Sequence, residues 1–552
     1  MTQYALIFEA ESIQSYIFDS GRLSDAVGAS VRLDQLCGDL APAGPEDKKT
    51  PDDLLSRVIA TVLGREIQKK NDPDVAFSRR GGGAFIALFQ SAALRDRVQA
   101  LWSATLADVA PGLRFGLVAS EGIHALAAAE AGMQAMKWQR NQPAPSLPET
   151  GPLTRLAPRT GRAAVQTMTE NAQKEWVDAQ TLVHRQRARR FNHDRLTARF
   201  STDLQNWPSD LEREFPFNQA GHKEIAVVHA DGNGLGVALQ ELAKHCKKTP
   251  DHYVEAYAGF SEAVSQATRA AAAHATNTVL APKTRKDGFV PARPLVLGGD
   301  DLTILLRPDV AVPFTQAFLA AFEVETEKEL KEARQKFNFL PVKLTAAAGI
   351  AIVQASHPFD RALHLAESLC GMVKSATKKR VTASEKEAPS GLMFYRQTVS
   401  LLDDWQDVQR VETTPKEAEE GVRYCTVHGP YLLHASKGEP TLPALAQLQT
   451  LADVLARPAL ANGPVRQLIT QLHQSPATAR KSWQRIWEML AHRQDAATQT
   501  ALRQALQALG LPAAPDALPC AHRSESPSDL HSTPLNDALT LAHLAVTQEE
   551  EA

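Results

Sequence analysis

The chain has 552 residues, which excludes a single hydrophobic core, because domains usually span roughly 100 to 200 residues. A hydrophobic share of 43%, a charged share of 22% and a formal net charge of -3 are ordinary for a globular protein and exclude a wholly basic coat for nucleic acid. The five cysteines lie far apart without a CxxC pair, which excludes a disulfide framework and a cysteine zinc site.

The sequence also lacks signals for a membrane or for export. No apolar run reaches the roughly 18 residues of a membrane span. The N-terminal stretch MTQYALIFEAESIQ carries acids where a secretory signal needs a positive flank. We therefore expect a cytoplasmic protein with no membrane partner.

Residues 1–150 form the first predicted domain, which opens with a strand at Tyr4–Phe8. Helices broken near Gly21 follow as far as Leu40, and a polar stretch rich in Pro and Asp then leads to a helix over Leu54–Lys69. Beyond it, the run AFSRRGGGAFIALF joins two apolar segments through three glycines, which predicts a β-hairpin.

The first domain is completed by a helix, a strand and a second helix. The helix covers Ala92–Val109, the strand lies in LRFGLVAS, and an Ala-rich helix ends near Asn141. Residues 151–221 then form a Pro/Arg-rich segment with at least one helix. We expect this segment to link the first domain to the next.

Residues 222–400 repeat the order of the first domain. IAVVHA is a predicted strand, GNGLG opens a helix, LVLGGDDLTILL is a hairpin, and VKLTAAAGIAIV is a strand before another helix. This order indicates an internal duplication. Residues 401–552 are rich in Leu, Ala and Gln with helical periodicity, which predicts a helical C-terminal domain ending in a polar, acidic tail.

The two copies differ in their acids. An alignment of Glu9 with Asp231 and of the two hairpins places Gly83-Ala84 opposite Asp300-Asp301. The first copy thus keeps Glu9 alone as a candidate ligand, and one carboxylate cannot hold two Mg²⁺ ions. Arg79-Arg80, directly before the glycines, would repel a bound cation, or they could instead attract a phosphate or RNA backbone, or serve only a hairpin that pairs with its sheet. We expect the first copy to be catalytically silent.

Three acids of the second copy are the candidate catalytic residues and metal ligands: Asp231, Asp300 and Asp301. A carboxylate at the end of a buried strand and two more in the next hairpin turn can converge on one point. Mg²⁺ or Mn²⁺ suits such oxygen ligands, and a metal pair activates an attacking hydroxyl while it stabilises a leaving pyrophosphate. The pattern therefore predicts nucleotidyl transfer.

Residues beside these acids are candidates for nucleotide binding. Glycines let main-chain N–H groups approach a triphosphate at the start of a helix, and they leave room above a tight hairpin turn. The candidates are Gly232, Asn233, Gly234, Leu235, Gly236, Gly298 and Gly299.

Five segments together resemble the polymerase/cyclase-type large subunit of type III CRISPR effector complexes: ESIQSYIF, AVGAS, HADGNGLG, LGGDDLTILL and TAAAGIAIVQASHPFDRALHLAESL. The resemblance implies an α+β fold with two ferredoxin-like palm domains, of which the first is degenerate, a helical linker and a helical C-terminal domain. It also implies that ATP is the substrate and that cyclic oligoadenylate, a second messenger of antiviral defence, is the product.

The resemblance extends to further residues and to partners. Lys374 lies where the family has a lysine near the triphosphate. The implied partners are the other CRISPR subunits, crRNA and target RNA of a guide-RNA effector complex, and a homo-oligomer is also open. Many relatives begin with an HD nuclease domain, which is not expected here. The segment PLTRLAPRTGRAA resembles a zinc-binding stretch without its cysteines, so no zinc is expected.

Two alternatives remain open at this point. The chain could act as an RNA-binding scaffold subunit with little cyclase activity, although intact acids beside intact glycines argue against an idle site. It could also be a templated polymerase or a cyclic dinucleotide synthase, which share the metal chemistry. The sequence GGDD instead of GGDEF disfavours a diguanylate cyclase.

Overall fold

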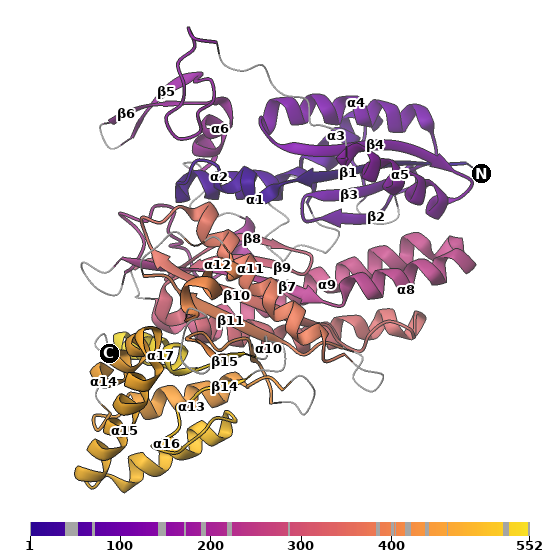
Figure 1. Cartoon of the computed structure of the whole chain (residues 1–552). Helices are drawn as coiled ribbons and strands as arrows, with labels where there is room; N and C mark the ends of the chain where they lie inside the picture. The colour runs from indigo at the N-terminus through magenta and orange to yellow at the C-terminus, as the bar shows by residue number, and fades with distance from the viewer. Residues whose placement is uncertain are drawn as a thin grey trace.

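The computed structural model describes residues 2–38, 53–68, 72–141, 151–170, 173–188, 195–217, 223–284, 288–381, 387–398, 402, 404–414, 421–435, 441–460, 462–522 and 529–549. Figure 1 shows the first palm at one end, the second palm in the middle and a helical region at the C-terminal end. Within the described ranges, no helix combines the length and apolar composition that a membrane span requires.

The first palm has the ferredoxin-like order of strands and helices. Its elements are β1 (Gln3–Glu11), α1 (Ile13–Phe18), α2 (Leu23–Cys37), α3 (Leu54–Leu63), β2 (Val75–Gly81), β3 (Ala84–Phe89), α4 (Ala92–Val109), β4 (Arg114–Gly122) and α5 (Ala125–Arg140). The strands form an antiparallel sheet in the order β2-β3-β1-β4. The helix α3 ends earlier than predicted, because Gly64 caps it in the left-handed conformation.

The second palm repeats this topology and extends it. Its elements are β7 (Glu224–Asn233), α8 (Leu235–Lys248), α9 (Tyr253–Ala275), β8 (Ala292–Gly298), β9 (Asp301–Leu306), α10 (Pro308–Lys336), β10 (Thr345–Gln354), α11 (Phe359–Lys378) and β11 (Gly391–Arg396). The sheet order is β13-β11-β10-β7-β9-β8, where β13 is Tyr431–Leu432. The parallel strand β11 was not predicted. The predicted α+β fold with two palms is confirmed.

The duplication holds residue by residue in the strand register. In the first palm Glu9 lies opposite Ala84, and in the second palm Asp231 lies opposite Asp301. The backbone turns left-handed at equivalent points before the following helix, at Ser12 (φ 51°) and at Gly234 (φ 79°). The alignment of the two copies is therefore correct.

Residues alternate between the two faces of β7, as they do in any strand. Ala226, Val228 and Ala230 belong to the core under α9 and α10, whereas Ile225 and Val227 belong to the core under α11. The alternation places His229 and Asp231 on the α11 face as well. The two side chains therefore face α11, the helix that carries Lys374.

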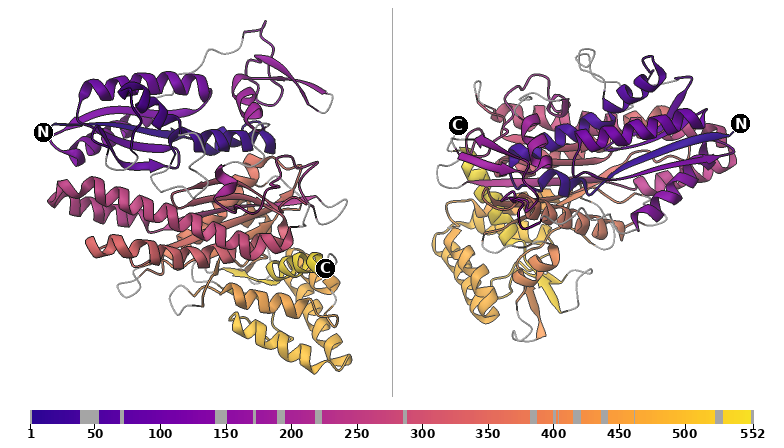
Figure 2. Two further views of the ribbon diagram at one scale, coloured as in Figure 1. Left: turned by 180° about the vertical axis from the view of Figure 1, so that it is seen from behind. Right: turned by 90° about the horizontal axis from the view of Figure 1, so that it is seen from above.

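The two palms pack against each other. Helix α9 of the second palm lies against β2 of the first, where Ser78 Oγ donates to Tyr253 Oη at 3.1 Å. The hairpin turns also meet, since a Cβ on Gly298 would lie 3.1 Å from Gly82 Cα. Figure 2 shows from two further sides that the sheet of the first palm lies along the second palm.

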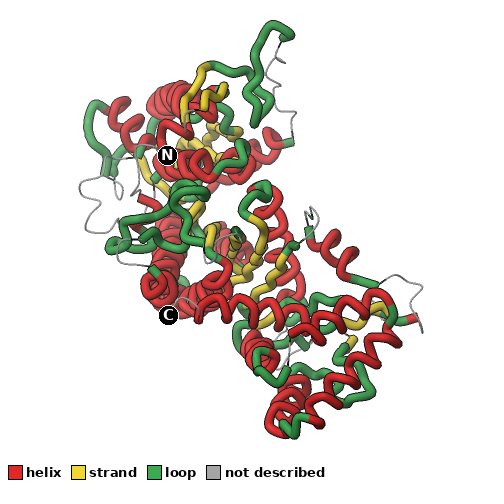
Figure 3. Tube along the Cα trace, turned by 90° about the vertical axis from the view of Figure 1, so that its left-hand side faces the viewer, coloured by secondary structure: helices red, strands yellow, loops and turns green. Residues whose placement is uncertain are grey.

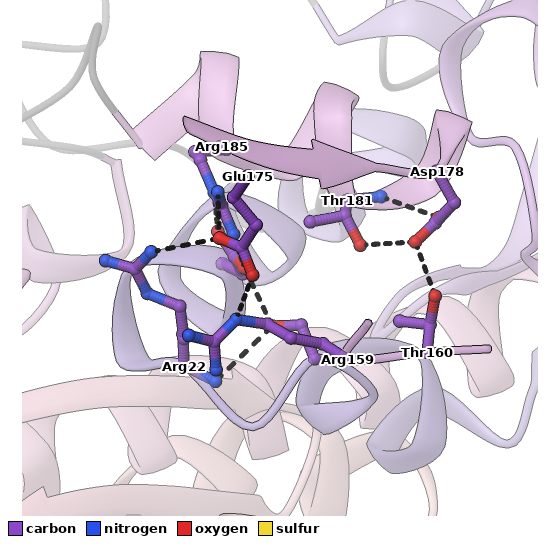
Figure 4. Close-up of polar contacts among 9 residues, drawn as sticks. Arg22, Arg159, Thr160, Glu175, Asp178, Thr181 and Arg185 are labelled. Atoms are coloured by element: carbon purple, nitrogen blue, oxygen red, sulfur yellow. Dashed lines mark hydrogen bonds and ion pairs between the residues drawn. The ribbon is translucent and has the colours of Figure 1, made fainter. Parts of the chain in front are cut away.

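The segment between the palms forms a small hairpin and two helices: β5 (Gln166–Glu170), β6 (Gln173–Val177), α6 (Ala179–Ala188) and α7 (Arg195–Ala198). The two strands were not predicted. An ion pair holds α6 to α2, because Arg185 donates twice to Asp25, each time at 2.9 Å. Glu175 of β6 joins the hairpin to α6, since it accepts from Arg185 at 2.9 Å and from Arg159 at 2.6 Å (Figure 4). Arg185 and Asp25 are fully buried, so each charge depends on the other.

The C-terminal region is mainly helical (Figure 3), as predicted. Its helices are α12 (Trp405–Glu412), α13 (Leu445–Leu455), α14 (Asn462–Gln474), α15 (Pro476–His492), α16 (Ala496–Ala508) and α17 (Leu535–Glu549). A short sheet of β12 (Arg423–Cys425), β15 (Leu530–Ser532) and β14 (Ala521–His522) was not predicted. Helix α17 contacts α10 and thereby joins this region to the second palm.

Candidate functional site

The three predicted acids come together at one end of the second palm sheet. Asp231 lies near the end of β7 and pairs with Asp301, the first residue of β9. Asp300 lies in the turn before β9, next to Gly299, whose φ of 62° favours glycine. The hydroxyl of Thr268 on α9 donates a hydrogen bond to the Gly299 carbonyl at 2.6 Å, which ties this turn to α9.

Lys374 of α11 reaches the same point. Its Nζ forms an ion pair with Asp231 Oδ2 and donates to the Gly232 carbonyl at 3.0 Å. The lysine thus balances the charge of one acid of the three. The predicted contact of Lys374 with a triphosphate stays a prediction.

The other two acids are held in an environment that disfavours their charge. Burial raises the pKa of Asp300 to about 7 and the pKa of Asp301 to about 8, and the negative charge of Asp231 adds to both effects. Asp301 keeps 37% of its side-chain surface exposed, yet its Oδ1 is buried and accepts no hydrogen bond. Such a carboxylate pair gains most from a nearby cation.

The donor set fits Mg²⁺ or Mn²⁺ better than a softer metal, because it consists of carboxylate oxygens. In the described part of the chain, no three His, Cys, Asp or Glu side chains already form a complete metal-binding group. Mg²⁺ commonly takes one or two protein carboxylates and completes its shell with waters and substrate phosphates. Asp231, Asp300 and Asp301 are the residues that would hold it, and the unpartnered Oδ1 of Asp301 is consistent with that role.

Two of the predicted glycines have a structural reason to be there. A Cβ on Gly232 would lie 2.8 Å from both Cβ and Oδ2 of Asp300, so only glycine lets this acid approach β7. Gly234 adopts a left-handed conformation and directly precedes α8, whose first turn is open to solvent at Gly236 and Val237. This open helix N-terminus is suited to a phosphate group.

The remaining predicted nucleotide-binding residues are placed differently. The side chain of Asn233 is buried and donates to Thr345 Oγ1 at 3.1 Å, so its amide links β7 to β10. Leu235 is half-buried against the core at the start of α8. Gly298 lies against the hairpin of the first palm, as described above. A nucleotide contact of these three residues stays a prediction.

The sequence interpretation missed residues around Asp301. His229 Nδ1 lies 3.4 Å from Asp301 Oδ1 and 3.2 Å from Thr303 Oγ1. The side chain of Glu367, on α11, is half-buried, and its negative charge acts on both His229 and Asp301. The spacing of His229 and Asp231, two residues apart on a strand, is the signal that could have revealed the histidine.

A cavity of about 330 Å³ lies beside Asp301 at the junction of the palms. The first palm contributes Ser12, directly before α1, Gln14 of α1 and the hairpin glycines, and the second palm contributes Gly298 and Asp301. A half-open cavity of this size that carries a few polar groups is typical of small-molecule sites.

The equivalent point of the first palm has no such acids. Glu9 forms an ion pair with Arg140, and Ala84 occupies the position of Asp301. The prediction that Arg80 would repel a cation beside the glycines is wrong. Its side chain is buried behind the strand, where it donates to the Cys37 carbonyl at 2.7 Å and to Asp53 at 2.5 Å, because successive strand residues point to opposite faces.

Comparisons with known proteins bear on the second palm in particular. Residues 224–383 match the family model described as Cas10/Cmr2, second palm domain. No curated protein matches the chain. Among solved structures, the Csm1-Csm4 cassette in complex with cA4 shows 10% identity and a TM-score of 0.40, and it covers 68% of this chain and 53% of that chain. Csm1 from T. onnurineus shows 13% identity and a TM-score of 0.37, with 74% and 56% covered.

The chain spans about half the length of these solved structures. The stretch matched by the family model includes β7, the GGDD hairpin and Lys374, and so contains all three acids of the site. The resemblance inferred from the sequence is thus confirmed: residues 224–383 match a second palm domain of the Cas10/Cmr2 family.

Proposed function

We propose that this protein is a nucleotidyltransferase that joins ATP into cyclic oligoadenylate. One observation carries the proposal: a palm that matches the Cas10/Cmr2 family brings Asp231, Asp300 and Asp301 together at one end of its sheet, with Lys374 as a counter-charge. Two divalent ions, when bound, supply Lewis-acid activation of an attacking hydroxyl and stabilisation of the leaving pyrophosphate. The three carboxylates are the residues that would hold these ions.

The other residues position the nucleotide and balance charge. The open N-terminus of α8, preceded by Gly234, offers main-chain N–H groups to a triphosphate. Lys374 pairs with Asp231 when no phosphate is present and can pair with a phosphate oxygen instead when one arrives. The cavity between the palms gives a second nucleotide room beside Asp301, as is required for one hydroxyl to attack the α-phosphate of another nucleotide.

The proposal also includes the complex in which the protein works. The family match favours a subunit of a type III CRISPR effector complex, in which other CRISPR subunits, crRNA and target RNA are the partners. In that setting the cyclic oligoadenylate is a second messenger for antiviral defence. ATP is favoured over GTP by the family match and not by any contact to a base.

The test is to incubate the purified protein with each NTP and Mg²⁺ or Mn²⁺ and to identify the products by mass spectrometry. Target RNA and partner subunits are added in a parallel reaction, because an effector subunit can require them for activity. We expect cyclic oligoadenylate from ATP and none from a protein in which Asp300 and Asp301 are both changed to Ala. If this double mutant made as much product as the unmodified protein, the assignment of the catalytic site would be refuted. Cyclic diguanylate made from GTP would refute the assignment of ATP as the substrate.

A further inference from the structure

The β5–β6 hairpin between the palms has two unlike faces. Side chains alternate along each strand, and residues opposite each other in the register share a face. Met168 and Val177 lie on the inner face and are buried. The outer face is exposed at every position and consists of these residues: Val165, Thr167, Thr169, Lys174 and Trp176. The hairpin thus packs against the rest of the protein on one side only.

Exposed hydrophobic side chains gather on and beside this outer face. Val165 is 56% exposed and Trp176 is 38% exposed. In the preceding turn, Leu153 is fully exposed and Leu156 is 48% exposed. Single exposed hydrophobic residues are common on any protein, whereas a group of them in one short segment marks a site of interaction. Protein interfaces are also rich in Trp and Arg, and here the Arg155 guanidinium lies over the Trp176 ring, 5.1 Å from its centroid.

The charge at the outer face is positive. Lys174 belongs to the face, Arg155 covers part of it, and none of the five residues of the face is acidic. The acidic Glu175 points to the inner face instead, where it accepts from Arg185 and Arg159. A surface that complements the outer face is therefore apolar in the middle and carries carboxylates at its rim.

The hairpin is also held in a fixed position. In addition to the contacts described above, Arg22 lies 3.6 Å from Glu175, and the Thr160 hydroxyl donates to Asp178 at 2.7 Å (Figure 4). Figure 1 shows β5 and β6 at the outer edge of the molecule, beyond α6, which packs on α2. A preformed surface loses little conformational freedom when a partner binds.

We infer that the outer face docks another protein subunit, whose contact surface is an apolar recess rimmed by carboxylates; this rests on the proposed function, in which partner subunits surround the chain. Single-stranded RNA would fit the face less well, because bases stack on aromatic rings. Trp176 is the single aromatic residue of the face, and Arg155 already lies over its ring. Valine and leucine side chains offer no surface on which a base can stack.

The test measures the affinity of the full-length chain for the purified assembly of the other effector subunits by biolayer interferometry. Trp176→Glu should weaken binding by about tenfold or more, because it places a charge in the apolar centre of the contact. Changing Arg155 and Lys174 together to Glu should weaken binding by about threefold or more and should make it less sensitive to added NaCl. In a second experiment, benzoylphenylalanine replaces Thr167, and light should link this position to one other protein subunit.

Gln166→Glu is the matched control, since Gln166 is exposed on the inner side of the same strand, and it should leave the affinity unchanged. Thermal melts verify that each variant is folded. Unchanged affinity of folded Trp176→Glu protein would overturn the docking face. A photo-crosslink from position 167 to RNA, or to a second copy of this chain, would overturn the partner that we assign. If the unmodified chain bound no other subunit, the proposed effector complex itself would be overturned, whatever the variants do.

Discussion

Asp301→Asn should stabilise the metal-free protein at alkaline pH, even though the same change should abolish turnover. The folded-state pKa of Asp301 lies at about 8, above its ordinary value of 3.8, because burial and the charges of Asp231 and Glu367 disfavour the carboxylate. When the folded-state pKa of a carboxyl group is raised, its contribution to the free energy of unfolding is fully present below about pH 4. That contribution is lost as the pH rises through about 8. Asparagine has no charge to lose and avoids this cost.

The size of the effect follows from the same values. A rise from 3.8 to about 8 corresponds to a ceiling of about 6 kcal/mol, at about 1.4 kcal/mol per pH unit. Because 37% of the Asp301 side-chain surface is exposed, water screens most of this energy, and we expect about 1–2 kcal/mol. For a domain of this size that corresponds to a melting temperature higher by roughly 2–8 °C.

The measurement is a thermal melt in EDTA at pH 5 and pH 8.5. The variant should melt above the unmodified protein at pH 8.5, and the difference should shrink at pH 5. Added Mg²⁺ should raise the melting temperature of the unmodified protein more than that of the variant. Asp453→Asn, at an exposed acid of α13, is the control and should shift little at either pH. A variant that is less stable at pH 8.5 would contradict the electrostatic account.

Three further outcomes are expected. Asp231→Ala should remove Mg²⁺-dependent turnover, whereas Glu9→Ala, which breaks only an ion pair with Arg140, should leave it nearly unchanged in a product assay; the reverse result would require a site shared by both palms. Gly232→Ala should lower turnover by about tenfold or more while the fold persists by circular dichroism, because the new methyl group displaces Asp300. Arg185→Met should lower the free energy of unfolding by about 3–5 kcal/mol in denaturant titrations, since it leaves Asp25 buried without its partner, and a chelator should not reproduce this loss.

The duplicated palm and its acids were predictable because their signals are local. The strand alternation around Glu9 and Asp231 and the glycines of each hairpin fix the register, and a one-residue slip would move every side chain to the other face. The position of Asp301 opposite Asp231 follows from that register alone. The closeness of Lys374 was expected only by family resemblance, since 143 residues separate it from Asp231 in the sequence.

The rest depended on contacts between distant segments. Gln14 of α1 and Asp301 of β9 line one cavity although they belong to different palms, and no spacing in the sequence brings them together. Arg80 was misjudged because its partner Asp53 lies on another element, before α3, and a buried arginine looks like an exposed one in a sequence. The short strands β12, β14 and β15 carry too few residues for a periodic pattern, and tertiary contacts alone make them strands.

The presence of both palms in one chain has a consequence for assembly and for evolution. Two separate palms would meet with a frequency set by their concentration, whereas tethered palms face each other at a high, fixed effective concentration. Identical palms in a symmetric dimer must also keep every residue that either position needs. The tether removes that demand, so the hairpin of the first palm can carry Gly83-Ala84 and specialise for contact with its neighbour, while the second palm alone retains its acids.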